Sequence, residues 1–433
     1  MTMSLIDRIR TGEARVAVIG LGYVGLPLAV EFAKSGLSTV ALDIDTSKVS
    51  LLEQGESYIA DVSTEDVRAV INSGHLFPTT DFNTLVDVDT IDICVPTPLR
   101  KTRDPDLSYV VAAVDEIAKH LHPDQLVILE STTYPGTVEE VVRPRLETSD
   151  LLAGRDFYLA FSPERVDPGN SRWNTRNIPK VVGGIDDAST KVAATLYEKI
   201  IETVIPVSST TVAEMVKLLE NTFRAVNIGL ANEIALMCRR LGVDVWEVIE
   251  AAKSKPFGYM PFYPGPGLGG HCIPIDPFYL SWKAKQSGFE CRFIELAGQI
   301  NGAMPRYVIE RVVDALNSRS LAIRDSRVHL FGMSYKPNVS DIRESPAIDI
   351  ALLLREKGAV LSYSDPFVSS VREGNLELDA ISLDKVLDDG IDCSIIVTDH
   401  SDFNYERIVE LSPVIVDTRN ALKGMTEKHI FRL

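Results

Sequence analysis

Cysteine is scarce in this chain of 433 residues, and the few cysteines follow no pattern. The five are odd in number and form no Cys-x-x-Cys pair, which excludes a disulfide framework and a structural zinc site. Cys272 alone lies in a segment rich in glycine and proline. The others lie in or beside strand-like and helical segments and are expected to be buried structural thiols: Cys94, Cys238, Cys291 and Cys393.

Long apolar runs and an excess of basic residues are also lacking. No run approaches the ~18 apolar residues of a membrane span. Charged residues interrupt any leader-like segment near the N-terminus: Asp7, Arg8, Arg10 and Glu13. Acidic residues outnumber basic ones by 61 to 44, a net charge of −17 that argues against nucleic acid and repels anionic ligands at long range. We expect a cytoplasmic protein without nucleic-acid or membrane partners, in which any phosphate site is built locally.

The apolar segments of the first half predict a doubly wound α/β domain over residues 1–207. A strand-like run ends in a glycine turn, and strands then alternate with helices, which predicts a parallel sheet covered on both faces. The expected strands lie at 15–20, 38–43, 90–95, 125–130 and 157–161, and the expected helices at 26–35, 106–120 and 138–146.

A central helical domain is expected over residues 208–322. Residues 211–241 contain no proline and a single glycine, so they predict one long helix. This helix is apolar around much of its circumference, as is typical of a helix buried between domains or at a subunit contact. We therefore expect a homodimer or larger homo-oligomer that forms through the central helical domain.

The last part of the chain, residues 323–433, returns to the α/β pattern. Strands are expected at 327–332, 360–363, 392–397 and 414–417, with a helix at 346–356. The predicted fold class is thus α/β, with two doubly wound Rossmann-like domains joined by a central helical domain with one long helix. The last domain lacks a complete Gly-x-Gly-x-x-Gly motif, so we assign it no second dinucleotide.

A glycine motif ends the first strand and opens the first helix: Gly20-Leu21-Gly22-Tyr23-Val24-Gly25. In that context the glycines let the backbone approach a pyrophosphate at a helix N-terminus, whereas the alternative is a plain tight turn. Asp43, eighteen residues after the last glycine, suits a ribose 2′-hydroxyl and repels a 2′-phosphate, so we predict NAD rather than NADP. Lys48 is either a second contact or a solvated lysine at a helix start.

Cys272 lies in the segment PGPGLGGHCIPIDP at 264–277, which is too rich in glycine and proline to be ordinary core. We interpret it as a thiol presented for reaction, with an inert loop cysteine as the alternative. An ordinary thiol is mostly protonated at neutral pH, so reactivity requires a nearby cation or a helix N-terminus. Adjacent side chains point apart and no further ligand cluster exists, so we expect no metal at His271 and Cys272.

The long helix offers the cation. Lys217, Asn221 and Arg224 share one of its faces, at spacings of four and three residues. Polar groups on an otherwise apolar helix are costly to bury unless they are partnered or used, and a solvated stripe is the alternative.

Three further segments follow predicted strands. ESTTYPGT at 130–137 and FSPERVDPG at 161–169 lie where doubly wound sheets bind ligands, and their hydroxyls and carboxylate suit the handling of water or a proton. The alternative for both is a surface turn. The segment YKPNVSDIRES at 335–345 places two cations before a helix, which suits a local phosphate site.

Together these segments resemble the nucleotide-sugar 6-dehydrogenases, the family of the UDP-glucose and UDP-N-acetylhexosamine dehydrogenases. The matching motifs occur in family order and span nearly the whole chain: GLGYVGLP, VPTP at 95–98, ESTTYPGT, SPERVDPG, EMVKLLENTFRAVNI at 214–228, PGPGLGGHCIPIDP, and GMSYKPNVSDIRES at 332–345. The resemblance implies that two NAD molecules in succession oxidise the C6 alcohol of a sugar to a carboxylate.

The resemblance also implies catalytic roles. Cys272 matches the cysteine that holds the intermediate as a thiohemiacetal and then as a thioester. Lys217 matches the lysine that stabilises the oxyanion, and Asn221 its hydrogen-bonding companion. Asp276 matches the aspartate that orients a water. The two remaining matches handle water and protons: Glu164 in proton transfer and thioester hydrolysis, and Thr132 in positioning water.

Binding residues follow from the same resemblance. Phe262 and Tyr263 resemble the segment that wraps the nucleotide sugar, Lys336 the lysine that reaches it from the last domain, and Arg343 an arginine near the cofactor. The further cofactor positions implied are Tyr23, Val24, Lys48, Pro96, Thr97 and Thr132. The further substrate positions implied are Glu164, Arg165, Val166, Lys217, Asn221, Arg224 and Gly269.

One departure from the family bears on the sugar. UDP-glucose dehydrogenases carry Ser before the cysteine and an NPEF-type loop, whereas His271-Cys272 and the PERV loop resemble the N-acetylhexosamine branch. We expect UDP-N-acetylglucosamine ahead of UDP-N-acetylmannosamine, then UDP-glucose or GDP-mannose, and a uronate product for bacterial surface polysaccharide. The rival hypotheses are a single-step β-hydroxyacid dehydrogenase, which needs neither Cys272 nor a second α/β domain, and a non-enzymatic NAD-binding sensor.

Overall fold

The structure, a computed structural model, describes residues 3–59, 61–98, 104–166, 172–270 and 272–433. His271 and residues 167–169 of the predicted site segments therefore lie outside the described residues. The chain divides into two compact units, each with its own large sheet. The first unit is Met1–Glu220 with Phe278–Ser287, and the second is Asn221–Pro277 with Gly288–Leu433.

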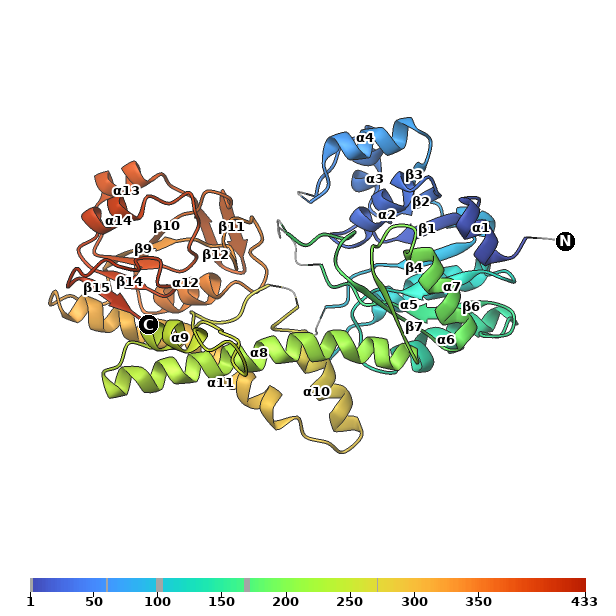
Figure 1. Cartoon of the computed structure of the whole chain (residues 1–433). Coiled ribbons are helices and arrows are strands. Elements are labelled where there is room, and N and C mark those ends of the chain that lie inside the picture. Colours follow the sequence, from blue (N-terminus) through green and yellow to red (C-terminus); the bar gives the residue numbers. More distant parts are fainter. Residues whose placement is uncertain (1–2, 60, 99–103, 167–171, 271) are drawn as a thin grey trace. The chain divides into compact units, whose positions relative to one another are not determined.

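The first unit is built on an eight-stranded sheet in the order β3-β2-β1-β4-β5-β6-β7-β8 (Figure 1). The strands are β1 Arg15–Ile19, β2 Ser38–Leu42, β3 Leu76–Thr79, β4 Thr90–Ile93, β5 Leu126–Leu129, β6 Tyr158–Phe161, β7 Lys180–Gly184 and β8 Val204–Val207. Neighbouring strands are parallel, as predicted, except that β6 and β7 pair antiparallel. The strand order reverses between β1 and β4, and their carboxyl ends form the switch point at which such sheets bind ligands.

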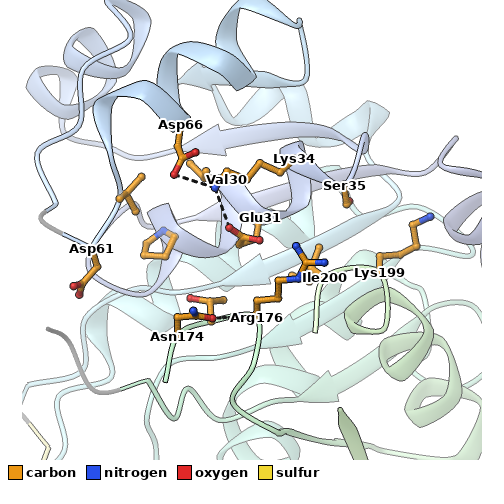
Figure 2. A pocket seen from close by; sticks show the side chains of 13 residues that line it. Val30, Glu31, Lys34, Ser35, Asp61, Asp66, Asn174, Arg176, Lys199 and Ile200 are labelled. Carbon is orange, nitrogen blue, oxygen red and sulfur yellow. Dashed lines mark hydrogen bonds and ion pairs between the residues drawn. The ribbon is translucent and has the colours of Figure 1, made fainter. Parts of the chain in front are cut away.

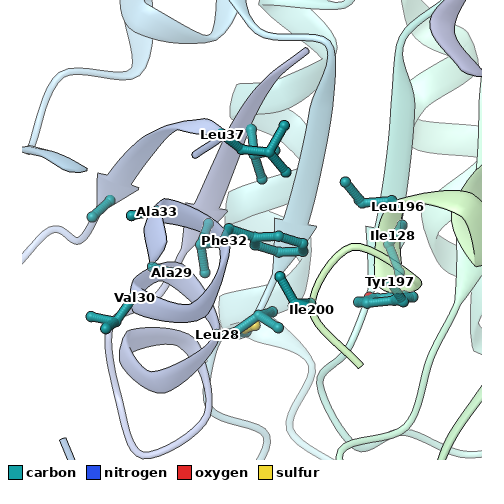
Figure 3. Packing of buried hydrophobic residues seen from close by; sticks show 14 of the residues in the cluster. Leu28, Ala29, Val30, Phe32, Ala33, Leu37, Ile128, Leu196, Tyr197 and Ile200 are labelled. Atoms are coloured by element: carbon teal, nitrogen blue, oxygen red, sulfur yellow. The ribbon is translucent and has the colours of Figure 1, made fainter. Parts of the chain in front are cut away.

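Helices cover both faces of this sheet. Successive residues of a strand point to opposite faces, and in these strands both sets are apolar. In β1, Val16 and Val18 belong to one buried cluster and Ala17 and Ile19 to another. Figure 3 shows the first cluster, in which Phe32 of α2 lies near Tyr197 of α7 with ring centroids 6.3 Å apart. The helices are α1 Leu5–Thr11, α2 Gly25–Lys34, α3 Thr46–Glu53, α4 Thr64–Asn72, α5 Ser108–His120, α6 Arg143–Leu146 and α7 Asp187–Tyr197. The predicted helix at 138–146 is confirmed, although its first part, Val138–Val142, is a π-helix.

The second unit carries a five-stranded sheet in the order β10-β9-β13-β14-β15, parallel throughout (Figure 1). The strands are β9 Arg327–Phe331, β10 Val360–Ser364, β13 Cys393–Ile396, β14 Ile415–Asp417 and β15 Ile430–Arg432. A hairpin of β11 Ser370–Glu373 and β12 Leu376–Asp379 was not predicted. The predicted helix at 346–356 is confirmed as α12 Pro346–Glu356, and α13 Leu383–Asp389 and α14 Tyr405–Leu411 complete the unit.

The predicted long helix is confirmed as α8, Thr210–Leu241. It is accompanied by α9 Val245–Lys253, α10 Asp276–Gln286 and α11 Arg292–Asn317. Its single glycine is needed for packing, because a Cβ on Gly229 would lie 3.2 Å from the Ala297 backbone of α11. Seven large apolar side chains of α8 nevertheless stay exposed at steps of three, four or seven residues, and we call them the α8 stripe: Val212, Met215, Leu219, Phe223, Leu230, Met237 and Leu241.

Three of the four cysteines predicted to be buried are buried, whereas Cys291 is only half-buried at the start of α11. In the described part of the chain, no helix has the length and apolar character needed to cross a bilayer. The same residues contain no group of three or more His, Cys, Asp or Glu side chains arranged for a metal ion.

Candidate active site

The glycine motif forms a turn at the switch point of the first sheet, and each glycine has its own reason to be there. Gly20 has φ +92°, and a Cβ on it would lie 2.7 Å from the Cys94 carbonyl oxygen after β4. A Cβ on Gly25 would lie 1.9 Å from the Gly20 carbonyl oxygen, so α2 can start only with glycine there. Nothing lies within 4 Å of the Cβ position of Gly22, which leaves the backbone open to a ligand. The turn therefore fits the pyrophosphate of a dinucleotide.

Asp43 ties the end of β2 to this turn. Its Oδ2 accepts hydrogen bonds from the Leu21 N–H at 2.8 Å and from Lys48 Nζ at 3.1 Å, and its Oδ1 accepts from the Asp45 N–H at 2.9 Å. Tyr58 donates its hydroxyl to the Leu21 carbonyl at 2.7 Å and holds the turn from the other side. Lys48 is therefore paired with Asp43, and not merely solvated.

Four further predicted cofactor residues follow β1 and β4 at the same edge of the sheet. Val24 directly precedes α2, and the side chains of Tyr23 and Pro96 are exposed. Thr97 is buried, and its carbonyl accepts a 2.6 Å hydrogen bond from the Tyr279 hydroxyl of α10.

The structure brings Lys217 and Thr132 together. Lys217 is buried on α8, and its Nζ donates to Thr132 Oγ1 at 2.5 Å. One turn earlier, Glu214 accepts from the Gly136 N–H at 2.5 Å and from the Val138 N–H at 3.0 Å. Burial raises the pKa of Glu214 to about 7, although both N–H bonds oppose that rise. Glu214 fastens the loop after Thr132 to α8, a role that our sequence analysis missed.

Glu164 is held at both carboxylate oxygens. Its Oε1 accepts from the Arg165 N–H at 2.7 Å and from the Val166 N–H at 2.6 Å, while its Oε2 lies 3.7 Å from Lys180 Nζ. The Arg165 guanidinium donates to both oxygens of Glu220 on α8, with its shorter bond at 2.5 Å. Arg165 therefore fastens this loop to α8.

The second unit brings together Cys272, Asp276 and Asn221. The Cys272 carbonyl accepts from the Ile275 N–H at 3.1 Å and from the Asp276 N–H at 2.8 Å, so the cysteine stands in the turn that begins α10. Asp276 is buried, and its Oδ2 accepts from Asn221 Nδ2 of α8 at 2.6 Å. Arg224, three residues further along α8, is exposed. One of the two features that the sequence analysis asked for near a reactive thiol, a helix N-terminus, follows Cys272 by four residues.

The glycines before Cys272 are explained by one aromatic side chain. A Cβ on Gly269 would lie 2.7 Å from Tyr335 Cβ, and a Cβ on Gly270, whose φ is +84°, would lie 2.7 Å from the same ring. The Gly270 N–H also donates to the Arg343 carbonyl at 3.0 Å. The cysteine loop is therefore seated on the 335–345 segment.

The two cations of that segment have local partners. The Lys336 ammonium lies 5.6 Å from the ring centroid of Tyr335. The Arg343 guanidinium pairs with Asp341 at 2.6 Å. Behind the segment, His400 Nδ1 accepts from the Asn338 N–H at 3.0 Å, which fixes the backbone two residues after Lys336.

Of the predicted pair Phe262 and Tyr263, Tyr263 lines a cavity of about 330 Å³ in the second unit. Tyr263 stacks on Trp246 with centroids 6.2 Å apart and donates its hydroxyl to Glu250 at 2.7 Å. Phe262 packs edge-on against Phe223 at 5.7 Å. The cavity is lined by Trp246, Glu250, Tyr263, Pro264, Asp399, Arg419, Asn420 and Lys423.

Arg419 is one of several cavity residues that our sequence analysis did not name. It follows β14, its Nε donates to the Val397 carbonyl at 2.9 Å, and a Cβ on Gly265 would lie 2.7 Å from its guanidinium. Burial lowers the pKa of Arg419, and the charge of Asp399 opposes this. The signal available was its place just after a predicted strand, where such sheets bind ligands.

A second cavity, of about 400 Å³, lies on the outer side of α2 in the first unit (Figure 2). Three of its charged residues are paired with one another, because Lys34 Nζ lies 3.0 Å from Asp66 and 3.3 Å from Glu31. It shares no residue with the predicted site, so we assign it no part in the chemistry.

Comparisons with known proteins match all three parts of the chain to one family. Residues 14–201 match the NAD binding domain of the UDP-glucose/GDP-mannose dehydrogenase family, residues 211–303 its central domain and residues 329–424 its UDP binding domain. The UDP-N-acetyl-D-mannosamine dehydrogenase of Pyrococcus horikoshii is 36% identical, with 96% of this chain and 98% of the relative covered. The UDP-N-acetyl-D-glucosamine 6-dehydrogenase of Pseudomonas aeruginosa is 37% identical, with 83% and 84% covered. A solved structure of the Pyrococcus horikoshii UDP-D-ManNAc dehydrogenase matches with a TM-score of 0.88 at 35% identity, covering 96% and 98% of the two chains.

Proposed function

The chain belongs to the UDP-glucose/GDP-mannose dehydrogenase family and is an NAD-dependent UDP-sugar dehydrogenase, and we propose that it oxidises a UDP-N-acetylhexosamine twice at C6. The observation that carries the proposal is Cys272, which stands in the turn that leads into α10, with its carbonyl bonded to the N–H of Asp276, the partner of Asn221. A single-step alcohol dehydrogenase has no use for a presented thiol, whereas an oxidation that continues to the acid needs one.

The His-Cys pair and the PERV loop in the sequence favour a UDP-N-acetylhexosamine over UDP-glucose. Among these sugars UDP-N-acetylglucosamine is our first candidate, and a relative 37% identical to this chain carries that name. UDP-N-acetylmannosamine is the second, because a relative that covers almost the whole chain carries that name. The cavity beside Tyr263 supports a nucleotide ligand, since it combines stacked aromatic rings with Arg419 and Lys423. The uronate product would serve the synthesis of surface polysaccharide.

NAD⁺ supplies the oxidant, since each molecule accepts one hydride when bound, so R–CH₂OH, water and two NAD⁺ give R–COO⁻, two NADH and three H⁺. We assign its pyrophosphate to the glycine turn and its ribose hydroxyls to Asp43. Cys272 Sγ adds to the C6 aldehyde and keeps it bound, first as a thiohemiacetal and then as a thioester. Water displaces the sulfur in the last step, which breaks the C–S bond and restores the thiol.

Charge and protons are handled by residues of the first unit in this proposal. Lys217 presents an ammonium to the oxyanion that forms at C6, and Thr132, its hydrogen-bond partner, positions water. Glu164 accepts a proton from the attacking water. The Asp276–Asn221 pair orients water beside Cys272.

The test counts NADH with a panel of UDP-sugars and the wild-type protein. We expect two NADH per UDP-N-acetylhexosamine consumed, and one NADH per substrate would favour a single-step dehydrogenase. The Cys272→Ser variant should bind NAD⁺ normally and form no uronate. Normal uronate formation by this variant would remove the covalent role, and no turnover of any UDP-sugar by wild type would favour an NAD-binding sensor.

We also propose that the protein self-associates through the α8 stripe. The seven exposed apolar side chains run along one side of a single helix, from Val212 to Leu241. A narrow apolar row of this kind is the pattern by which two helices pack together, and a monomer gains nothing by exposing it to water.

A further inference from the structure

A group of ionisable side chains is buried in the core of the first unit, directly behind Glu164. Asp92 lies in β4, Glu130 follows β5, Lys180 begins β7 and Tyr197 ends α7. All four are at least 95% buried. The aromatic ring of Tyr197 belongs to the apolar cluster around Phe32 (Figure 3). Ionisable groups this deep are costly unless each is paired, and they are rarely retained without a use.

These side chains form one continuous chain of contacts that ends at Glu164. Lys180 Nζ lies 3.7 Å from Glu164 Oε2 and donates to Glu130 Oε2 at 3.1 Å. The Tyr197 hydroxyl donates to the other oxygen of Glu130 and lies 2.8 Å from Asp92 Oδ1. The Lys180 ammonium also lies 4.9 Å from the ring centroid of Tyr197.

Because Tyr197 has a single hydroxyl hydrogen, one of the two carboxyl groups in this chain of contacts must carry a proton. Tyr197 can donate to only one of its two carboxyl neighbours, so the other must donate to it. Burial raises the pKa of Asp92 well above its ordinary value, and the charge of Glu130 raises it further. Asp92 Oδ2 has no hydrogen-bond partner, as suits a neutral acid. Asp92 therefore carries the proton and Glu130 stays ionised beside Lys180.

Lys180 is then the cation that stands between two carboxylates. Burial alone would lower the pKa of Lys180, but Glu130 and Glu164 outweigh burial and keep the ammonium charged. The Cys94 thiol, which also faces this group from the end of β4, is held neutral because burial raises its pKa. Without Lys180, Glu130 and Glu164 would face each other with no cation between them, and one of them would take up a proton.

We propose that Lys180 is a positioning residue for Glu164, and that Glu130, Tyr197 and Asp92 serve to hold its ammonium in place. The two N–H bonds to Glu164 Oε1 set the direction of the carboxylate, and the Lys180 ammonium, 3.7 Å from Oε2, holds in place the oxygen that accepts the proton. This inference rests on the proposed function, in which water attacks the thioester carbonyl, Glu164 takes a water proton, and the C–S electron pair leaves on Cys272 sulfur.

The decisive experiment separates hydrolysis from the two oxidations in Lys180→Met. This variant keeps the length of the side chain and removes its charge. With saturating NAD⁺ and the UDP-sugar that wild type turns over, we expect a burst of two NADH per subunit. A steady rate slower than wild type by on the order of 10- to 100-fold should follow. Intact-protein mass spectrometry should show the sugar adduct on Cys272, and the acid limb of the pH–rate profile should move to higher pH.

Three further variants keep the result interpretable. Lys180→Arg restores a cation and should recover much of the steady rate. Tyr197→Phe removes only a hydroxyl from the same chain and should show a weaker form of the same defect. Lys191→Met makes the same substitution at an exposed position of α7 and should match wild type. If Lys180→Met does not fold, Tyr197→Phe decides between the outcomes.

Two results would overturn the inference while leaving the proposed function intact. One is a Lys180→Met enzyme with the wild-type rate and pH profile. The other is a slow enzyme with no burst and no adduct, or with weakened NAD⁺ binding, because that pattern belongs to a purely structural lysine. Failure of the proposed function is recognised separately, since wild type itself would then form no NADH with any UDP-sugar.

Discussion

His329 shows how a single residue can depend on its burial for its charge state. It is buried in β9, with Nδ1 2.8 Å from Ser362 Oγ and Nε2 3.0 Å from Ser364 Oγ. Both partners are hydroxyls, which serve equally well as donors and acceptors, and no carboxylate is among them. Burial lowers the pKa of His329 to about 3, so the ring is neutral in the folded protein near neutral pH.

We predict that His329 makes the C-terminal sheet less stable in acid. Above the unfolded pKa of about 6.5 the ring is neutral in both states and contributes no pH dependence. Below it the unfolded chain binds a proton at His329, whereas the folded chain does not until about pH 3. The free energy of unfolding therefore decreases as the pH is lowered through that window. At pH 5 the loss is about 2 kcal/mol.

The measurement compares wild type with His329→Gln by hydrogen exchange of the β9 amides at pH 7 and pH 5. The substitution has its own cost at pH 7. From pH 7 to pH 5, the difference in free energy of unfolding between the two proteins should shift by about 2 kcal/mol in favour of the variant. An unchanged difference would show that His329 is protonated in the folded chain. Other titrating groups are common to both proteins and cancel.

At the level of elements, a helix can act on a loop through one side chain. Glu214 of α8 accepts two backbone N–H bonds from the loop that follows Thr132, one turn before Lys217 contacts Thr132 itself. The helix therefore holds the loop at two points. If the Glu214 contacts are lost, only Lys217 remains to position Thr132.

We predict that Glu214→Gln lowers kcat about tenfold, because an amide offers one acceptor where the carboxylate offers two and the loop with Thr132 shifts. The KM for NAD⁺ should change little, since the glycine turn is untouched. Steady-state kinetics with both substrates varied measure the two effects. Glu198→Gln, an exposed glutamate of the same unit, is the matched control and should behave as wild type. A variant with unaltered kcat would show that Lys217 suffices to hold Thr132.

The elements that were predictable from the sequence are those with strong apolar patterns. The strands β1, β2, β4, β5 and β6 and the helices α2, α5, α8 and α12 all lie within a few residues of their predicted ranges. β3 and β8 were missed because each contains a proline, β7 because it ends in two glycines, and the hairpin of β11 and β12 because half or more of its residues are polar. The antiparallel pairing of β6 with β7 has no local signal at all.

The site was predictable where its residues lie in short motifs, and it was not where partners are distant in sequence. The glycine turn, the loops after β5 and β6 and the segment before α10 were identified by their composition. Lys180 and Tyr197 were missed because nothing in their own segments marks them: Lys180 opens a short apolar strand, and Tyr197 ends a helix of mixed composition. Their partners come from other strands, as with Tyr197 and Asp92, which lie 105 positions apart in the sequence. Such networks exist only once the sheet has formed.

At the level of the whole molecule, each compact unit has a buried core of its own, yet α8 passes from one to the other without a break. Its buried side chains serve both cores, since Ala213 belongs to the core of the first unit and Cys238 to a cluster of the second. The α8 stripe belongs to neither. The exposed row is where we expect a partner to bind, and a second copy of the chain would supply an equally apolar one.

We predict that the protein is a dimer in solution and that Leu230→Glu, in the middle of the α8 stripe, converts it to a monomer. Burying a glutamate against an apolar helix costs several kcal/mol per copy, which exceeds what the remaining stripe contacts can offset. Size-exclusion chromatography with light scattering at micromolar concentration should give twice the chain mass for wild type and the chain mass for the variant. Leu152→Glu, at an exposed leucine away from α8, is the matched control and should remain dimeric. A monomeric wild type, or a Leu230→Glu variant of unchanged mass, would show that the stripe is not the contact.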